Sequence, residues 1–318
     1  MKFFENARVG NNKVSQYVAL ILAGYFAAQI PSTIYVVALI IDKMSNGNRE
    51  AALEMMAGNN ILAIFDTIPG FIAFMLTFAV WLGTTWWLFK PLHKRERMTL
   101  ISGEKKFRIQ NFNWGIIGYG LILTLITCIT MITDPDCYTV SEPGGRYYLF
   151  VALCIVLVPI QTSCEEFIFR GYLMQGVALC TKSKVWALVI TSVLFGLLHC
   201  VNNEVLANGF FTTIPIYIEI GLLMGFFAIL SDGIEISCGM HFINNFLAFT
   251  VFSSEGGTLS GNALVTFKRG AVSVSDYLIP IAVATLIYLC LHKKMGWDIK
   301  KAFDNSGLRK DVPPPYFA

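Results

Sequence analysis

Charge is what this sequence has least of. Only 14% of its 318 residues are charged, while 55% are apolar and the mean hydropathy is +0.60. A soluble domain carries roughly 25% charged residues, so this composition indicates a protein whose solvent is lipid. The net charge of +3 follows from the membrane-topology pattern described below, and no nucleic-acid partner is expected from it.

The sequence also lacks a cysteine pattern typical of a disulfide framework. It contains eight cysteines, most of them inside apolar runs, and no two form a CxxC pair. Buried free cysteine usually behaves as a small apolar residue. Cys164, Cys200 and Cys238 lie near the polar motifs described below and are interpreted in this way, rather than as ligands of a soft metal.

Long uncharged runs are present instead. Residues 17–41 and 111–133 contain no charge, and residues 61–89 contain only Asp66. Because roughly 20 apolar residues cross a hydrocarbon core of about 30 Å, these runs predict spanning helices. The predicted fold class is therefore all-α, a polytopic transmembrane helix bundle with eight spans. The expected spans are 15–41, 60–89, 113–133, 147–180, 185–200, 209–231, 234–253 and 276–292.

The fourth expected span, residues 147–180, is unusually long. As one straight helix its 34 positions would reach about 51 Å, well beyond the bilayer core. We therefore expect this segment to bend, break or partly emerge from the membrane. Pro159, Gly171 and Gly176 offer places for a bend, because proline removes a helical hydrogen bond and glycine weakens a helix locally.

The distribution of Lys and Arg predicts the orientation. With the N-terminus inside, 18 of the 24 Lys and Arg residues fall on inner segments and 5 on outer ones, while Arg170 lies within a span. Inner loops of membrane proteins are rich in these residues. We therefore expect both termini in the cytoplasm and a multi-pass protein of the plasma membrane.

One polar cluster lies directly after an uncharged run, in the segment EEFIFR. A charged side chain at mid-membrane costs on the order of 2.5–3.5 kcal/mol, so embedded charges tend to face the protein interior and serve function. Glu166 and Arg170 are spaced i, i+4 and can form an ion pair on one helix face. Glu165 points about 100° away and is left for proton transfer in a dry site. An ordinary charged helix end is the alternative interpretation.

Two further polar clusters occupy later spans. Phe195 and His199 (FGLLH) end the fifth span, and His241 and Asn245 (HFINN) share one face of the seventh. A single His at a helix end is more often a satisfied interfacial residue, and His with Asn can also form a clamp between helices. Each cluster taken alone therefore leaves its function open.

The three motifs taken together resemble the CPBP family of intramembrane proteases, which includes the CAAX prenyl endopeptidases and bacterial bacteriocin-processing or immunity (Abi) homologues. The family pattern is EExxxR, FxxxH and then HxxxN or HxxxD, and this chain carries EEFIFR, FGLLH and HFINN in that order. The resemblance covers residues 147–253. It implies an intramembrane endopeptidase that hydrolyses a peptide bond near the membrane.

The resemblance also implies a role for each motif residue. Glu165 and His199 would activate water, while His241 and Asn245 would bind a metal ion or the developing oxyanion. The supporting residues would be Glu166, Arg170 and Phe195. Two His and a carboxylate form a usual catalytic zinc set, which makes His199, His241 and Glu165 the candidate metal ligands. The family has also been interpreted as a metal-free glutamate protease, so zinc, another divalent metal and a metal-free mechanism all stay open.

The sequence is expected to form three regions. Residues 1–146 form a three-span N-terminal region, 147–253 the catalytic core, and 254–318 an outer loop, the last span and a cytoplasmic tail. The expected partners are membrane lipid and a membrane-anchored or lipidated protein or peptide substrate. Two alternatives stay open: a membrane immunity or scaffold protein on the same fold without proteolysis, and a small transporter, which also embeds charges in broken helices.

The topology can be tested by cysteine-accessibility labelling in a chain whose native cysteines have been replaced. Single cysteines in the 90–108 loop and in the C-terminal tail should react with an impermeant maleimide from the same, cytoplasmic side. The reason is that an even number of predicted spans separates them. Labelling from opposite sides would show that the fourth or the eighth span has been misread.

Overall fold

The computed structural model describes residues 2–57, 61–257, 262–268, 270 and 272–309. It confirms the predicted all-α class, because eight long helices form a bundle and only one small sheet is present among the described residues. The long helices are α2 (Val14–Ser45), α4 (Ile68–His93), α5 (Ile109–Thr133), α6 (Gly145–Glu166), α8 (Lys184–Leu198), α10 (Phe210–Leu230), α11 (Glu235–Thr250) and α12 (Val274–Met295).

Shorter elements connect and cap these helices. They are α1 (Lys2–Glu5), η1 (Asn6–Arg8), α3 (Arg49–Met56), η2 (Ile61–Asp66), η3 (Arg97–Leu100), the π-helical η4 (Phe167–Leu173), α7 (Met174–Thr181), α9 (Asn203–Asn208), α13 (Ile299–Ala302) and η6 (Ser306–Leu308). The strands are β1 (Tyr138–Val140), β2 (Phe252–Ser254) and β3 (Val265–Phe267). In the sheet, β3 lies between the other two, antiparallel to β1 and parallel to β2.

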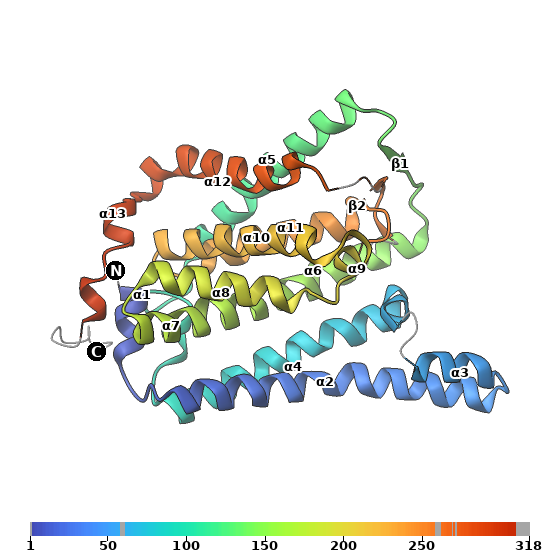
Figure 1. The fold of residues 1–318 in the computed structure, drawn as a ribbon, viewed down its shortest axis with the longest axis horizontal. Coiled ribbons are helices and arrows are strands. Elements are labelled where there is room, and N and C mark those ends of the chain that lie inside the picture. The colour runs from blue at the N-terminus through green and yellow to red at the C-terminus, as the bar shows by residue number, and fades with distance from the viewer. Residues whose placement is uncertain (1, 58–60, 258–261, 269, 271, 310–318) are drawn as a thin grey trace.

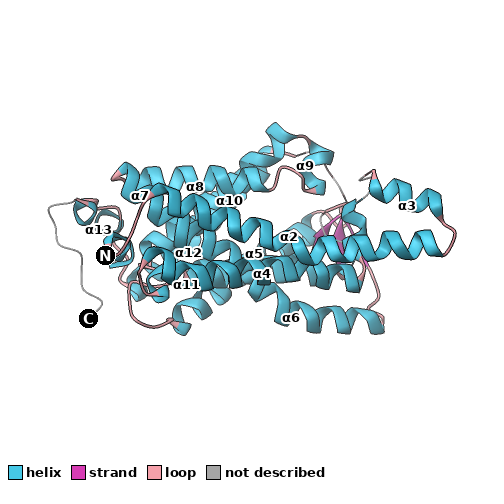
Figure 2. Cartoon of the chain, turned by 90° about the horizontal axis from the view of Figure 1, so that it is seen from below, coloured by secondary structure: helices cyan, strands magenta, loops and turns pink. Residues whose placement is uncertain are grey.

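The long helices run side by side between two ends of the molecule (Figure 1). One end holds α1 and α13, close to both chain termini. The opposite end holds α3, α9 and the small sheet (Figure 2). The main hydrophobic core extends from Phe3 through Phe227 to Leu308, so the three regions expected from the sequence contribute to one packed body.

A helix lies at each of the eight places where a span is predicted, but they differ in length. Among the described residues, six helical segments are long and apolar enough to cross a membrane. The other two, α8 with 15 residues and α11 with 16, would be about 22–24 Å long and are shorter than a hydrocarbon core of about 30 Å. The chain is thus a multi-pass membrane protein, while the count of eight spans stays a prediction.

The second predicted span starts too early. Instead of beginning at residue 60, which lies outside the described residues, the helix α4 begins at Ile68. The Thr67 hydroxyl accepts a hydrogen bond from the Gly70 amide at 3.1 Å, and Pro69 occupies the first turn. These are ordinary signals of a helix start. Asp66 therefore lies in η2, ahead of the spanning helix.

The fourth predicted span does not break. The segments α6, η4 and α7 run on as one apolar helical stretch of 37 residues, Gly145–Thr181. Neither Pro159 nor Gly176 interrupts it, and Gly171 lies within the π-helical part. The whole stretch is longer than a bilayer core is thick, so its bending or partial emergence from the membrane stays a prediction. Short π-helical stretches inside α-helices occur frequently at functional sites.

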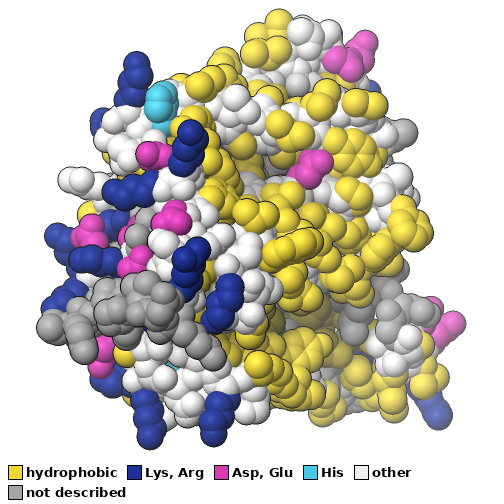
Figure 3. Space-filling model, turned by 60° about the vertical axis from the view of Figure 1, so that its left-hand side comes forward, with side chains coloured by type: hydrophobic (Ala, Val, Ile, Leu, Met, Phe, Trp, Pro, Cys, Tyr) yellow, Lys and Arg dark blue, Asp and Glu magenta, His cyan; other side chains and the backbone are white. Residues whose placement is uncertain are grey.

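Basic side chains gather at the end of the molecule that holds both termini, whereas apolar side chains cover its flank (Figure 3). At this end the Arg108 guanidinium binds both carboxylate oxygens of Glu235, at 2.8 and 2.6 Å, and thereby joins the start of α5 to the start of α11. Burial lowers the pKa of Arg108, but the hydrogen bonds and charge of Glu235 more than offset this, and its pKa is raised. This end is the predicted cytoplasmic one, and its orientation stays a prediction.

Helices α5 and α11 touch through glycines. A Cβ atom on Gly115 would lie 2.3 Å from the carbonyl oxygen of Ile236, and one on Gly239 would lie 2.1 Å from that of Phe112. Small residues allow such close backbone approach in membrane helices. The contact fixes the position of α11, which carries His241 and Asn245.

Gly239→Ala should destabilise the protein by about 1–3 kcal/mol, because the added methyl group would overlap backbone atoms of α5. The matched control is Gly83→Ala on α4, where an added Cβ would meet nothing within 4 Å. There the substitution should be neutral or slightly stabilising. Thermal unfolding of both variants in detergent measures the difference, and equal melting temperatures would contradict the close contact.

Candidate functional site

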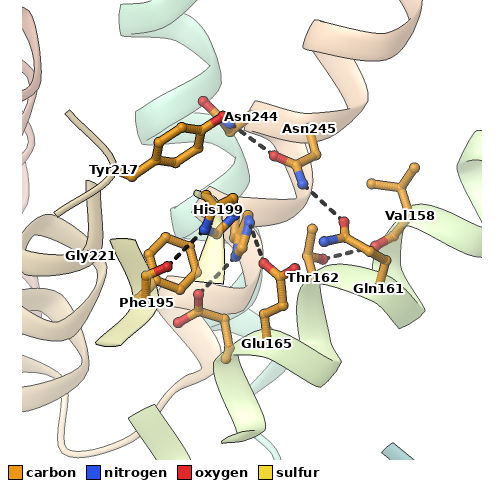
Figure 4. A network of polar contacts seen from close by, with 12 residues as sticks. Val158, Gln161, Thr162, Glu165, Phe195, His199, Tyr217, Gly221, Asn244 and Asn245 are labelled. Atoms are coloured by element: carbon orange, nitrogen blue, oxygen red, sulfur yellow. Dashed lines mark hydrogen bonds and ion pairs between the residues drawn. The ribbon is translucent and has the colours of Figure 1, made fainter. Parts of the chain in front are cut away.

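The polar motifs meet inside the bundle (Figure 4). Glu165 and Glu166 lie at the end of α6, Arg170 in η4, and Phe195 near the end of α8 with His199 just beyond it. His241 and Asn245 lie on α11. Three segments that are distant in the sequence therefore supply one group of side chains.

An ion pair forms the centre of this group. Arg170 Nη1 donates to Glu166 Oε1 at 2.8 Å, which is the i, i+4 pair expected from the sequence. The Arg170 side chain is 2% exposed, its Nη2 donates to the carbonyl of Gly221 at 3.2 Å, and its guanidinium carbon lies 4.3 Å from the ring centroid of Phe195. Since a buried ion pair needs such additional partners to compensate for lost hydration, the guanidinium is well held.

His241 lies between the two consecutive carboxylates. Its Nδ1 is 2.8 Å from Glu166 Oε1, and its Nε2 is 3.4 Å from Glu165 Oε2. A carboxylate paired with Arg only accepts hydrogen bonds, so His241 Nδ1 is protonated and donates a hydrogen bond to Glu166. Both ring nitrogens of His241 therefore face carboxylates.

Glu165 differs from Glu166 in its partners. Glu165 is 5% exposed, and one carboxylate oxygen of each glutamate, Oε2, makes no hydrogen bond among the described residues. The difference is that Glu166 Oε1 is paired with Arg170, whereas Glu165 has no guanidinium partner in the described part of the chain. This is the division between the two carboxylates that the helix spacing predicts.

His199 caps the end of α8, half-buried. Its Nδ1 lies 2.8 Å from the carbonyl oxygen of Phe195, and its ring stacks on Tyr217 with 4.3 Å between the ring centroids. A carbonyl oxygen can only accept a hydrogen bond, so Nδ1 is the protonated nitrogen. The lone pair of His199 is then on Nε2, the form that a general base requires.

Asn245 is joined to a residue that sequence reasoning missed. Its Nδ2 donates to Gln161 Oε1 at 2.9 Å, and its Oδ1 accepts from Asn244 Nδ2 at 3.0 Å. Asn244 Oδ1 in turn accepts from the Tyr119 hydroxyl on α5 at 3.0 Å. Gln161 precedes Glu165 by four residues on α6, so helical spacing was the signal that could have found it.

The donor set has some features of a metal site but not its arrangement. His199 and His241 each donate a hydrogen bond to an acceptor through Nδ1, as His ligands of metals commonly do. In each ring Nε2 is the nitrogen that could bind a metal ion. Yet no three His, Cys, Asp or Glu side chains within the described ranges form a group that could hold an ion. The side chains as placed do not fit a metal ion, so the ligand set Glu165, His199 and His241 stays a prediction and no step below runs through a metal.

An apolar groove of about 440 Å³ lies beside the polar group, between α4, α6 and α11. Its lining includes Leu82 and Trp86 from α4, and Ser163, Phe167 and Cys238 next to the motif residues. Because Cys238 precedes His241 by one helical turn, the groove and the polar group share a wall. The groove thus offers apolar surface beside the candidate site.

These features define a multi-pass helix bundle with a buried Glu, His and Asn group. Residues 146–247 match the family described as type II CAAX prenyl endopeptidase Rce1-like, which confirms the resemblance found in the sequence. The match indicates a CAAX-type intramembrane protease. The chain is also 28% identical over 267 residues to the uncharacterized protein YyaK of Bacillus subtilis (strain 168), covering 82% of this chain and 86% of that protein. No solved structure matches the chain.

Glu166→Gln should lower the free energy of unfolding by about 3–5 kcal/mol, because it leaves the buried Arg170 guanidinium without a counter-charge. Glu165→Gln is the matched control on the adjacent residue. It should unfold close to wild type, because Glu165 has no guanidinium partner among the described residues and its removal strands no buried charge. Thermal unfolding and folded yield in detergent compare the two, and an equal loss in both variants would contradict this difference between the carboxylates.

Proposed function

We propose that this protein is an intramembrane endopeptidase in which Glu165 and His199 activate the attacking water. The observation that carries the proposal is the unequal environment of the two neighbouring carboxylates. Glu166 Oε1 is held by Arg170 and His241, whereas Glu165 has no guanidinium partner among the described residues and lies 3.4 Å from His241 Nε2. A buried carboxylate beside an imidazole with a free nitrogen can accept a proton from water.

In the proposed mechanism, His199 Nε2 and Glu165 remove a proton from water as its oxygen attacks the carbonyl carbon of the peptide. The tetrahedral intermediate then collapses, the C–N bond breaks, and the same groups return the proton to the leaving amine. Glu166, which is paired with Arg170, holds His241 through Nδ1, and His241 Nε2 lies 3.4 Å from Glu165. In this arrangement His241 positions the base, and Asn245 faces the developing oxyanion.

The proposed substrate is a membrane-anchored or lipidated protein or peptide, cleaved at the plasma membrane. Two observations support this class. The polar group is buried in a bundle whose flank is apolar, and the groove beside it is lined almost entirely by apolar side chains. An apolar membrane segment or a lipid chain could lie in such a groove while the adjoining peptide bond reaches Glu165.

The test is cleavage of membrane-anchored reporter peptides by the purified protein in liposomes. Glu165→Gln should reduce turnover by about 10²–10⁴, the range attributed to general acid and base catalysis, with an unchanged melting temperature. The matched control is Glu54→Gln on the exposed surface of α3, which should cleave like wild type. If the wild-type protein cleaves no reporter, a membrane immunity or scaffold protein on this fold replaces the proposal. Undiminished cleavage by Glu165→Gln would remove Glu165 from the mechanism.

A further inference from the structure

Three hydrogen bonds form a directed chain that ends at the candidate site. The Tyr119 hydroxyl on α5 donates to Asn244 Oδ1, Asn244 Nδ2 donates to Asn245 Oδ1, and Asn245 Nδ2 donates to Gln161 Oε1 on α6. The distances are 3.0, 3.0 and 2.9 Å. Each donor points toward the next residue, so the bonds polarise one another in the same direction.

This series of hydrogen bonds leaves one N–H donor unused at its end, on Gln161. The Oε1 atom of Gln161 accepts from Asn245, and the Nε2 atom of Gln161 donates no hydrogen bond to any of the residues that the structure describes. Gln161 is 5% exposed, yet its Nε2 is not one of the fully buried side-chain atoms that lack a partner, so this N–H can reach an acceptor that enters the site. In Figure 4, its amide nitrogen points from α6 toward the side on which Glu165 and His199 lie.

Each histidine already has an acceptor for its Nδ1–H. An oxyanion must be stabilised by hydrogen-bond donors as the carbonyl is attacked. Both nitrogens of His241 face carboxylates, at 2.8 Å from Glu166 and 3.4 Å from Glu165. His199 uses its Nδ1–H on the Phe195 carbonyl and presents a lone pair on Nε2. Gln161 and the second N–H of Asn245 are neutral donors beside them.

We propose that Gln161 is a catalytic residue of this peptidase, whose Nε2–H donates to the carbonyl oxygen of the scissile bond as it becomes an oxyanion. This inference rests on the proposed function. When water oxygen bonds to the carbonyl carbon, the carbonyl electron pair moves to the oxygen that Gln161 contacts. When the C–N bond breaks, that pair re-forms the carbonyl. Gln161 gains and loses no proton. Tyr119 and Asn244 are positioning residues that act through Asn245, whose bond to Gln161 Oε1 fixes which end of the Gln161 amide faces the substrate.

Two substitutions separate a donor role from a structural one. Gln161→Glu keeps the shape and the acceptor for Asn245 but replaces the N–H donor by oxygen. Gln161→Met removes both the donor and the acceptor without adding charge. The matched control is Gln29→Met, at an exposed glutamine on α2 that bonds only within its own helix. The kcat, the KM and the melting temperature are measured for each variant on the same membrane-anchored reporter.

Both Gln161 variants should lower kcat by about 10²–10³, the loss seen when one oxyanion donor is removed, with little change in KM. Inhibition by a peptide aldehyde, whose hydrate presents the tetrahedral oxygen, should weaken by a similar factor. Gln29→Met should match wild type in every measurement. Full turnover by Gln161→Glu would overturn the inference, since it would show that Gln161 serves only to hold Asn245, while the proposed function would stand. Absence of cleavage by the wild type would instead contradict the proposed function, and this inference with it.

Discussion

The ion pair between Arg170 and Glu166 is the interaction on which the rest of the site depends. An Arg side chain that is 2% exposed in a lipid-embedded bundle requires a counter-charge, and Glu166 is its only carboxylate within ion-pair distance among the described residues. The same guanidinium binds the Gly221 carbonyl on α10 and lies over the ring of Phe195 on α8, while Glu166 also binds His241 on α11. One buried pair therefore ties α6 to three other helices. Because Glu165 is the next residue along the chain, its position follows from that pair.

Helical geometry gives the two neighbouring glutamates different partners. Consecutive residues of a helix point about 100° apart, so Arg170 can pair with only one of the two carboxylates. Glu166 becomes a structural anchor, while Glu165 is buried beside His241 without a guanidinium partner among the described residues. The same logic applies to the imidazoles, because each commits its Nδ1 to an acceptor. In this way neighbouring partners, rather than residue type, assign which group can move a proton.

The features predicted from the sequence are the local ones. Spans follow from hydropathy along the chain, and the Glu166–Arg170 pair follows from i, i+4 spacing, since lipid forces such groups to face the interior. The start of α4 at Ile68 was missed because the apolar run continues upstream of its capping Thr67. Gln161 and Tyr119 were missed for another reason: a neutral polar side chain in an apolar helix forms no motif. The hydrogen-bond partner of such a side chain depends on how the helices pack against one another. The sequence of a single helix does not reveal that packing.

That packing links the N-terminal region to the candidate chemistry. Gly115 and Gly239 bring the backbones of α5 and α11 into contact. Tyr119 follows Gly115 by one helical turn, and this contact lets its hydroxyl reach Asn244 at 3.0 Å. A bulkier residue at either glycine would push the two backbones apart. The series of hydrogen bonds from Tyr119 to Gln161 depends on this contact through its first bond, at 3.0 Å. The region matched to the protease family begins at residue 146, so α5 lies outside it. The orientation of the amide groups beside Glu165 therefore depends on a helix that the family resemblance does not include.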